Sequence, residues 1–156
     1  METKSNFDDL TIFTTTFYKD DPVSQVREKL AVKLFENAKD LGVKVVVVDG
    51  GSNEAFLERI QLIPNVSLVV DSALTMGESR RKALEIATAE SHTQFYMWVE
   101  PEKDALITTE SLDAMLAPLR EGKTDIVIPK RKNLETLPPL QAKLEQRANK
   151  RASKIT

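Results

Sequence analysis

The valine run between residues 43 and 48 constrains the fold of this chain more than any other segment. Five of its six residues are valine, with only Lys44 between them. A strand that faces solvent on one side alternates polar and apolar residues, whereas a strand covered on both faces is apolar throughout. The run therefore predicts a central strand, parallel to its neighbours and hydrogen-bonded on both sides.

Strand-like and helix-like segments alternate along the rest of the chain. Segments rich in β-branched and aromatic residues indicate further strands at Leu10–Thr16, Val66–Val70, Gln94–Val99 and Asp125–Ile128. Amphipathic segments indicate helices between the strands, the first with Asp21 as its N-cap and Pro22 at its first position. This order predicts an α/β fold, in which an open, mostly parallel, twisted sheet of about five strands is flanked by helices in a Rossmann-like arrangement.

The charge of the chain changes near residue 130. Residues 129–156 carry eight Lys and Arg against two Glu, a charge of +6, which leaves −8 for the first 128 residues of a chain whose net charge is −2. Leu140, Leu144 and Ala148 form only a narrow apolar seam in this tail. We therefore predict an α/β domain over residues 1–130. A basic, helical extension over residues 131–156 would pack on that domain or extend from it.

The cysteine and histidine contents exclude several classes of site. The chain has no cysteine, which excludes a disulfide-stapled scaffold, a Cys-ligated metal site and a cysteine nucleophile. Its single histidine, His92, excludes a two-histidine zinc motif. The longest apolar run is too short to span a membrane, and the N-terminus lacks the apolar segment of a signal peptide. We expect a soluble, cytoplasmic protein.

In open α/β sheets the ligand binds outside the carboxyl ends of the strands, so the residues that follow each strand matter most. Asp49-Gly50-Gly51-Ser52 follows the valine run. Its glycines would let a ligand approach the backbone, and Asp49 could accept a hydrogen bond from a base or a ribose. The alternative is a turn that caps the next helix.

A second candidate segment, Met76–Arg81, opens a predicted helix at Gly77–Ser91. Arg80 and Arg81 lie near the positive end of the helix dipole, which is unfavourable unless one of them meets a phosphate. The alternative is that both arginines are solvated or paired with Glu85. A basic loop, Lys130-Arg131-Lys132, could also reach phosphates or be solvated.

The third candidate segment is the acidic stretch after the fourth predicted strand. Glu100 and Glu102 are two residues apart, so in an extended segment they would share a face and could bind one divalent cation through oxygen ligands. Mg²⁺ or Mn²⁺ would be the expected cation, because the chain offers oxygen ligands rather than sulfur or clustered imidazole. The alternative is a solvent-facing acidic turn with Lys103 as its counter-charge.

In their order and placement these segments resemble the nucleotide-binding half of an inverting, GT-A-type glycosyltransferase of the family 2 kind. Val47–Ser52 is similar to the family's Val-Val-Asp-Asp-Gly-Ser pattern, and Gly77–Arg81 partly matches its Gly-x-x-x-x-Arg-Asn-like segment. Glu100-Pro101-Glu102 stands where the family has its metal-binding Asp-x-Asp. Glu replaces Asp at both metal positions, and Gly50 stands in place of the family's second Asp. The resemblance covers roughly residues 10–150.

The resemblance implies a nucleotide-diphosphate sugar as ligand. The residues that it assigns to the nucleotide are Thr14, Thr15, Thr16, Asp49, Gly50, Gly51, Arg80 and Arg81, and those that it assigns to Mg²⁺ or Mn²⁺ are Glu100 and Glu102. Enzymes of this family usually continue with a half that supplies the acceptor site and the catalytic base. We therefore expect this chain to be the N-terminal, nucleotide-binding half. The sugar, the acceptor and the catalytic residue are not assigned.

Three functions follow from these features. The first is a glycosyltransferase that inverts the sugar it transfers, and the second is a non-catalytic α/β module that binds a nucleotide or a partner protein. The third is a weak contact of the basic tail with a membrane surface or a nucleic acid. The third ranks last, because the tail lacks interleaved aromatic residues and the rest of the chain is acidic.

Overall fold

The computed structural model describes residues 7–129 and 138–152. The chain divides into two compact units, Met1–Thr109 and Glu110–Thr156. The predicted domain boundary between residues 130 and 131, like the basic loop Lys130-Arg131-Lys132, lies outside the described residues and stays a prediction.

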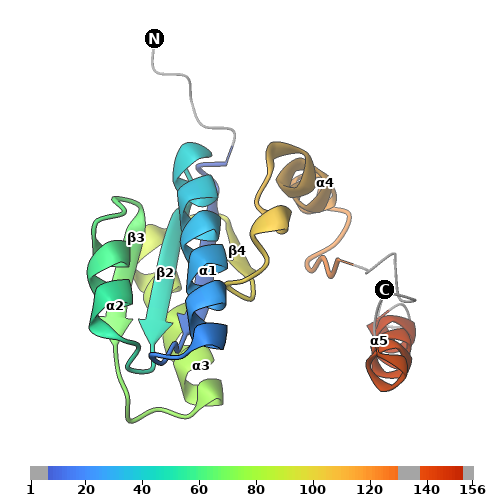
Figure 1. The fold of residues 1–156 in the computed structure, drawn as a ribbon. Helices are drawn as coiled ribbons and strands as arrows, with labels where there is room; N and C mark the ends of the chain where they lie inside the picture. Colours follow the sequence, from blue (N-terminus) through green and yellow to red (C-terminus); the bar gives the residue numbers. More distant parts are fainter. Residues whose placement is uncertain (1–6, 130–137, 153–156) are drawn as a thin grey trace. The chain divides into compact units, whose positions relative to one another are not determined.

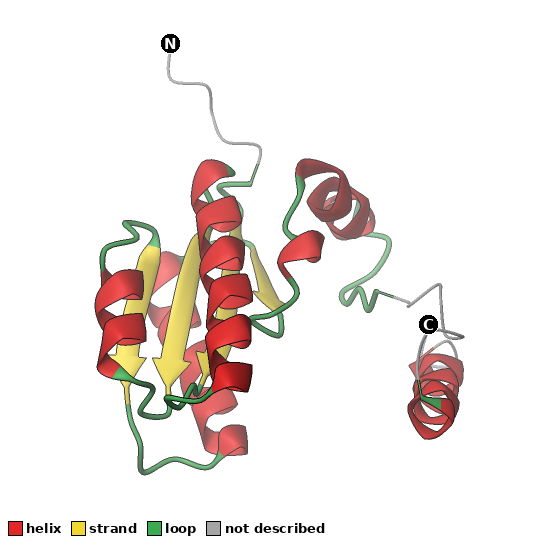
Figure 2. Ribbon diagram, viewed as in Figure 1, coloured by secondary structure: helices red, strands yellow, loops and turns green. Residues whose placement is uncertain are grey.

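The sheet belongs to the first unit. In the described residues, four strands form one all-parallel sheet in the order β3-β2-β1-β4 (Figures 1 and 2). The strands are β1 (Leu10–Thr16), β2 (Lys44–Asp49), β3 (Val66–Val70) and β4 (Phe95–Trp98). β2 pairs with β1 on one side and with β3 on the other. The predicted central strand is therefore confirmed, and its four consecutive valines, residues 45–48, are all buried.

Helices cover both faces of the sheet. The helices of the first unit are α1 (Pro22–Asp40), α2 (Glu54–Gln61), α3 (Met76–Ser91) and the 3-10 turn η1 (Asp104–Leu106). Figure 1 shows α1 and α2 on one face of the sheet and α3 on the other. The predicted α/β architecture with a Rossmann-like arrangement is therefore confirmed.

Side-chain caps set where the helices begin. The Asp21 carboxylate accepts hydrogen bonds from the amides of Val23 and Ser24, as expected for the N-cap of α1. α3 begins at Met76, one residue before the predicted start. The difference arises because Thr75 and Glu78 form a capping box, in which each side chain bonds the other residue's backbone N–H.

The fifth strand predicted at Asp125–Ile128 is wrong. This segment has no strand structure in the described residues, and the side chains of Ile126 and Ile128 are exposed. The Thr124 hydroxyl donates to the Ile126 carbonyl and accepts from its N–H, so it occupies backbone groups that a strand neighbour would need. A short apolar run does not form a strand unless a neighbouring strand pairs with it.

The second unit contains the described helix α5 (Pro139–Ala152) and, apart from its first residue, helix α4 (Thr109–Arg120). Leu112 and Leu116 of α4 are buried, whereas Leu140 and Leu144 of α5 are exposed.

Within the described part of the chain, no helix combines the length and the apolar character needed to cross a membrane.

The strand order creates a switch point beside β1. From β1 the chain moves outward through β2 to β3, and it then crosses back to place β4 on the other side of β1. In open α/β sheets, a crevice forms outside the carboxyl ends of the strands where the direction of winding reverses. Here that point lies between the carboxyl ends of β1 and β4.

Candidate functional site

A cavity of about 380 Å³ lies at this switch point. Its walls come from the end of β1 and the two residues that follow it, the residue after β2, and the segments that precede α3 and follow β4. The second turn of α1 and the first two turns of α3 complete them. Of the site residues predicted from the sequence, those that line the cavity are Thr15, Thr16, Gly50, Arg80 and Glu100. Those that do not are Thr14, Asp49, Gly51, Arg81 and Glu102.

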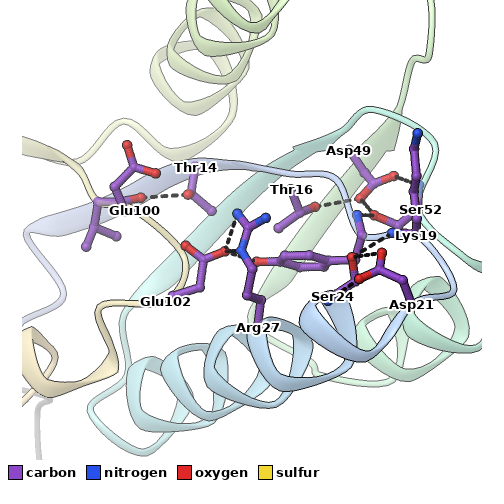
Figure 3. Close-up of polar contacts among 12 residues, drawn as sticks. Thr14, Thr16, Lys19, Asp21, Ser24, Arg27, Asp49, Ser52, Glu100 and Glu102 are labelled. Carbon is purple, nitrogen blue, oxygen red and sulfur yellow. Dashed lines mark hydrogen bonds and ion pairs between the residues drawn. The ribbon is translucent and has the colours of Figure 1, made fainter.

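Asp49 is fully buried, and protein donors surround its carboxylate. The carboxylate accepts from the Thr16 hydroxyl at 2.6 Å and from the Ser52 hydroxyl at 2.5 Å. It also accepts from the backbone N–H groups of Gly51 and Ser52 at 2.8 and 2.7 Å. Figure 3 shows the Asp49 carboxylate between Thr16 and Ser52. These contacts match the alternative interpretation of this motif, a turn before the next helix. A contact between Asp49 and a nucleotide base stays a prediction.

The threonines at the end of β1 alternate between two roles. The buried Thr14 hydroxyl donates to the Val99 carbonyl at 2.6 Å and so ties β1 to the end of β4. The buried Thr16 hydroxyl donates to Asp49 and ties β1 to β2. Thr15, between them, is partly exposed and lines the cavity. The hydroxyl groups of Thr14 and Thr16 thus have protein acceptors, which makes Thr15 the candidate to offer a hydroxyl group to a ligand.

The two glycines after β2 also differ in their roles. Gly50 lines the cavity, and a Cβ there would lie in ordinary contact with the Phe17 side chain, 3.5 Å from its Cδ2. Gly51 has φ of +99°, a conformation that residues with a side chain rarely adopt, and a Cβ there would lie 3.3 Å from the Ser72 Cβ. Gly51 therefore serves the turn rather than the cavity.

Arg80 reaches the cavity from α3. Its guanidinium lies over the Trp98 ring, 4.8 Å from the ring centroid, and its Nη2 is 3.2 Å from Glu100 Oε1. Arg81, the next residue, is exposed and does not line the cavity. The structure therefore distinguishes two arginines that the sequence left as alternatives.

Arg27 also lines the cavity, and the sequence analysis missed it. This residue comes from the second turn of α1, and its guanidinium lies 5.3 Å from the centroid of the Tyr18 ring. Its Nη2 and Nε are 2.8 and 3.0 Å from Glu102 Oε1. The one signal in the sequence is that Arg27 is the first basic residue of the helix that follows the switch-point strand.

Tyr18 contacts both Arg27 and Glu102. The side chain is fully buried, packs edge-to-face on Phe56, and donates from its hydroxyl to Glu102 Oε1 at 2.8 Å. Burial raises the pKa of the Tyr18 hydroxyl well above its ordinary range, and the hydrogen bond to Glu102 raises this pKa further. Tyr18 therefore stays protonated and remains a hydrogen-bond donor to Glu102.

The two carboxylates predicted to share a cation have different partners. Glu100 pairs with Arg80 from α3, whereas Glu102 pairs with Arg27 from α1, on the other face of the sheet. Figure 3 shows Glu102 beside Arg27, with Glu100 apart from both. Across the residues that the structure describes, no three Asp, Glu or His side chains come together as ligands would. In this structure each of the two carboxylates is paired with an arginine, and binding of Mg²⁺ or Mn²⁺ at these residues stays a prediction.

A second cavity, of about 470 Å³, lies at the opposite end of the sheet. Its walls come from the amino ends of β2 and β3 and the final turns of α1 and α3. None of the predicted site residues lines it. Ligands of open parallel sheets bind at the carboxyl ends of the strands, so the smaller switch-point cavity is the candidate site.

Comparisons of this chain with protein-family models, with curated proteins and with solved structures find no match. The likeness to glycosyltransferases therefore remains a resemblance of short motifs. The function has to be inferred from the residues of the switch-point cavity.

Proposed function

We propose that the switch-point cavity binds a nucleotide-diphosphate sugar and that the protein is glycosyltransferase-like. The observation that carries this proposal is the convergence of two arginines, Arg27 and Arg80, on one cavity of about 380 Å³. Pockets for small molecules span roughly 300–1,000 Å³, so the cavity has a suitable volume.

The chemistry of the cavity lining supports an anionic ligand with a ring system. Guanidinium groups are permanently charged and present planar forks of N–H donors that match phosphate oxygens. Leu74 and Met76 offer apolar surface on which a base or a sugar ring can pack. Ser72 and Thr15 offer hydroxyl groups for the polar edges of such a ring.

Binding is common to both enzymatic and non-catalytic forms of this proposal. In the enzymatic form, an acceptor hydroxyl displaces the diphosphate at the anomeric carbon with inversion, and the arginines stabilise the charge that develops on the leaving diphosphate. In the non-catalytic form, the cavity holds the nucleotide without transfer. Binding is therefore the first property to test.

Titration calorimetry with UDP, GDP and their sugar conjugates tests the proposal. We expect saturable binding of at least one of these ligands. We expect no binding of uridine or guanosine, because these nucleosides lack the phosphate groups that the arginines would bind. Arg80→Gln should weaken binding about tenfold, which corresponds to about 1.4 kcal/mol. The control is Lys82→Gln, since Lys82 lies on the same helix, pairs with Asp71 and does not line the cavity. If the folded protein binds no nucleoside diphosphate, the proposal is wrong.

A further inference from the structure

One short segment neutralises both arginines of the switch-point cavity. Glu100 and Glu102 flank Pro101 in the segment that follows β4, and each pairs with a different arginine. The two arginines come from α1 and α3, on opposite faces of the sheet. Each of the two arginines that could bind an anionic ligand is therefore paired with one carboxylate of this segment.

Each arginine also lies over an aromatic ring, and this contact does not involve the carboxylates. Arg27 lies over the ring of the fully buried Tyr18, and Arg80 lies over the ring of Trp98. A cation over an aromatic face gains about 0.5–1 kcal/mol at an exposed site and keeps its N–H groups free for an anion. Each guanidinium can therefore keep its position while it exchanges a carboxylate for a phosphate.

We infer that Arg27 and Arg80 form a clamp for the diphosphate of the ligand, and that Glu100 and Glu102 are built-in counter-ions that the diphosphate displaces. This inference rests on the proposed function and adds to it a second arginine and a role for the two carboxylates. In this role the carboxylates oppose binding, because they occupy the groups that the ligand needs. If the carboxylates instead held a metal ion, they would favour binding. The two interpretations therefore predict opposite effects on ligand affinity when a carboxylate is removed.

The two ion pairs differ in how firmly they are held. The side chains of Arg80 and Glu100 are 44% and 50% exposed, whereas that of Glu102 is only 17% exposed and also accepts from the Tyr18 hydroxyl. An exposed ion pair is worth at most about 1 kcal/mol, which limits the gain from removing Glu100 to about fivefold in affinity. Removal of Glu102, which is better shielded from solvent, should strengthen binding at least as much.

The test measures the affinities of UDP, GDP and inorganic pyrophosphate in the presence of a chelator. Glu100→Gln and Glu102→Gln should each tighten diphosphate binding about two- to fivefold, whereas Arg27→Gln should weaken it about tenfold. The matched control is Glu85→Gln, which removes one negative charge from an exposed position of α3 that does not line the cavity. Because Trp98 is the sole tryptophan of the chain and supports Arg80, its fluorescence should change on binding.

The results test the clamp and the proposed function separately, except for one outcome that overturns both. If UDP or GDP binds, but the glutamine variants bind it equally or more weakly, the clamp is wrong and the proposed function stands. In a parallel titration with Mn²⁺ and no chelator, a gain in affinity that the double glutamine variant loses also overturns the clamp. If pyrophosphate shows the expected pattern and no nucleoside diphosphate binds, the proposed function is wrong and the clamp stands. Absence of binding by any of the three probes overturns both, and thermal melting shows whether each variant is folded.

Discussion

Thr16 and Asp49 face each other in the parallel register of β1 and β2, and the Thr16 hydroxyl donates a 2.6 Å hydrogen bond to Asp49 Oδ2. This contact joins two strands at the edge where the switch-point cavity opens. Because Asp49 also accepts from Gly51 and Ser52, one buried carboxylate organises the turn after β2. These contacts indicate that Asp49 stabilises the fold.

Loss of the Asp49 carboxylate should therefore destabilise the fold. Asp49→Ala leaves buried N–H and hydroxyl donors without an acceptor, and each such group costs about 1–3 kcal/mol. We expect the free energy of unfolding to fall by about 3 kcal/mol or more in urea titrations. The control, Asp40→Asn at the exposed end of α1, should change it little. Unchanged stability of Asp49→Ala, together with weaker nucleotide binding, would restore the ligand-binding role.

Removal of the Tyr18 hydroxyl should have a moderate cost at neutral pH. Tyr18→Phe keeps the buried ring on Phe56 but removes a hydrogen bond to a carboxylate, which is worth about 1.5–3 kcal/mol. Calorimetric or denaturant unfolding at pH 7 measures this difference. A variant as stable as the wild-type protein would show that Arg27 alone satisfies Glu102.

The same tyrosine should make stability depend on alkaline pH. Its pKa is raised in the folded state, so its contribution is fully present below the unfolded pKa of about 10 and is lost as the pH rises above that value. Between about pH 10 and 11 the wild-type protein should lose stability more steeply than Tyr18→Phe. Parallel slopes in unfolding titrations of the two proteins would contradict this. Tyr96→Phe serves as the control, since it removes the other tyrosine of the chain.

Acid should weaken the start of α1 through Asp21. Hydrogen bonds from the backbone N–H and the hydroxyl of Ser24 hold the pKa of Asp21 below its usual range. A lowered pKa means that this contribution is present above the unfolded pKa of about 3.9 and is lost as the pH falls through the folded value. Asp21→Asn keeps a good N-cap at pH 7 but should flatten the fall in melting temperature between about pH 5 and 2. Asp20→Asn, one residue earlier, should not flatten it.

The central strand should tolerate truncation poorly. Val47 is fully buried between the two helix layers, so Val47→Ala removes buried methyl groups and leaves a cavity. We expect a loss of about 2–3 kcal/mol in the free energy of unfolding. Leu62→Ala removes more apolar volume at a position that is 83% exposed, and it should change stability by less than about 0.5 kcal/mol. Equal losses in the two variants would contradict the central position of β2.

Local patterns were enough to predict most of the α/β framework. The valine run indicated a strand covered on both faces, and Asp21 with Pro22 indicated where α1 begins. These predictions succeeded because periodicity and caps act over a few neighbouring residues. The strand predicted at Asp125–Ile128 failed because pairing needs a neighbour, and no local pattern supplies one.

The sequence by itself determined that the chain alternates strands and helices, and that polar residues follow the strands at one edge of the sheet. Only the tertiary structure decided what those residues do. It buried the Asp49 carboxylate and placed Arg80 rather than Arg81 at the cavity. It also brought Arg27 to the same cavity, although Arg27 precedes Arg80 by 53 residues in the chain (80 − 27). The physical reason is that hydrophobic periodicity marks which residues are buried, whereas a carboxylate's partner depends on which helix the fold places beside it.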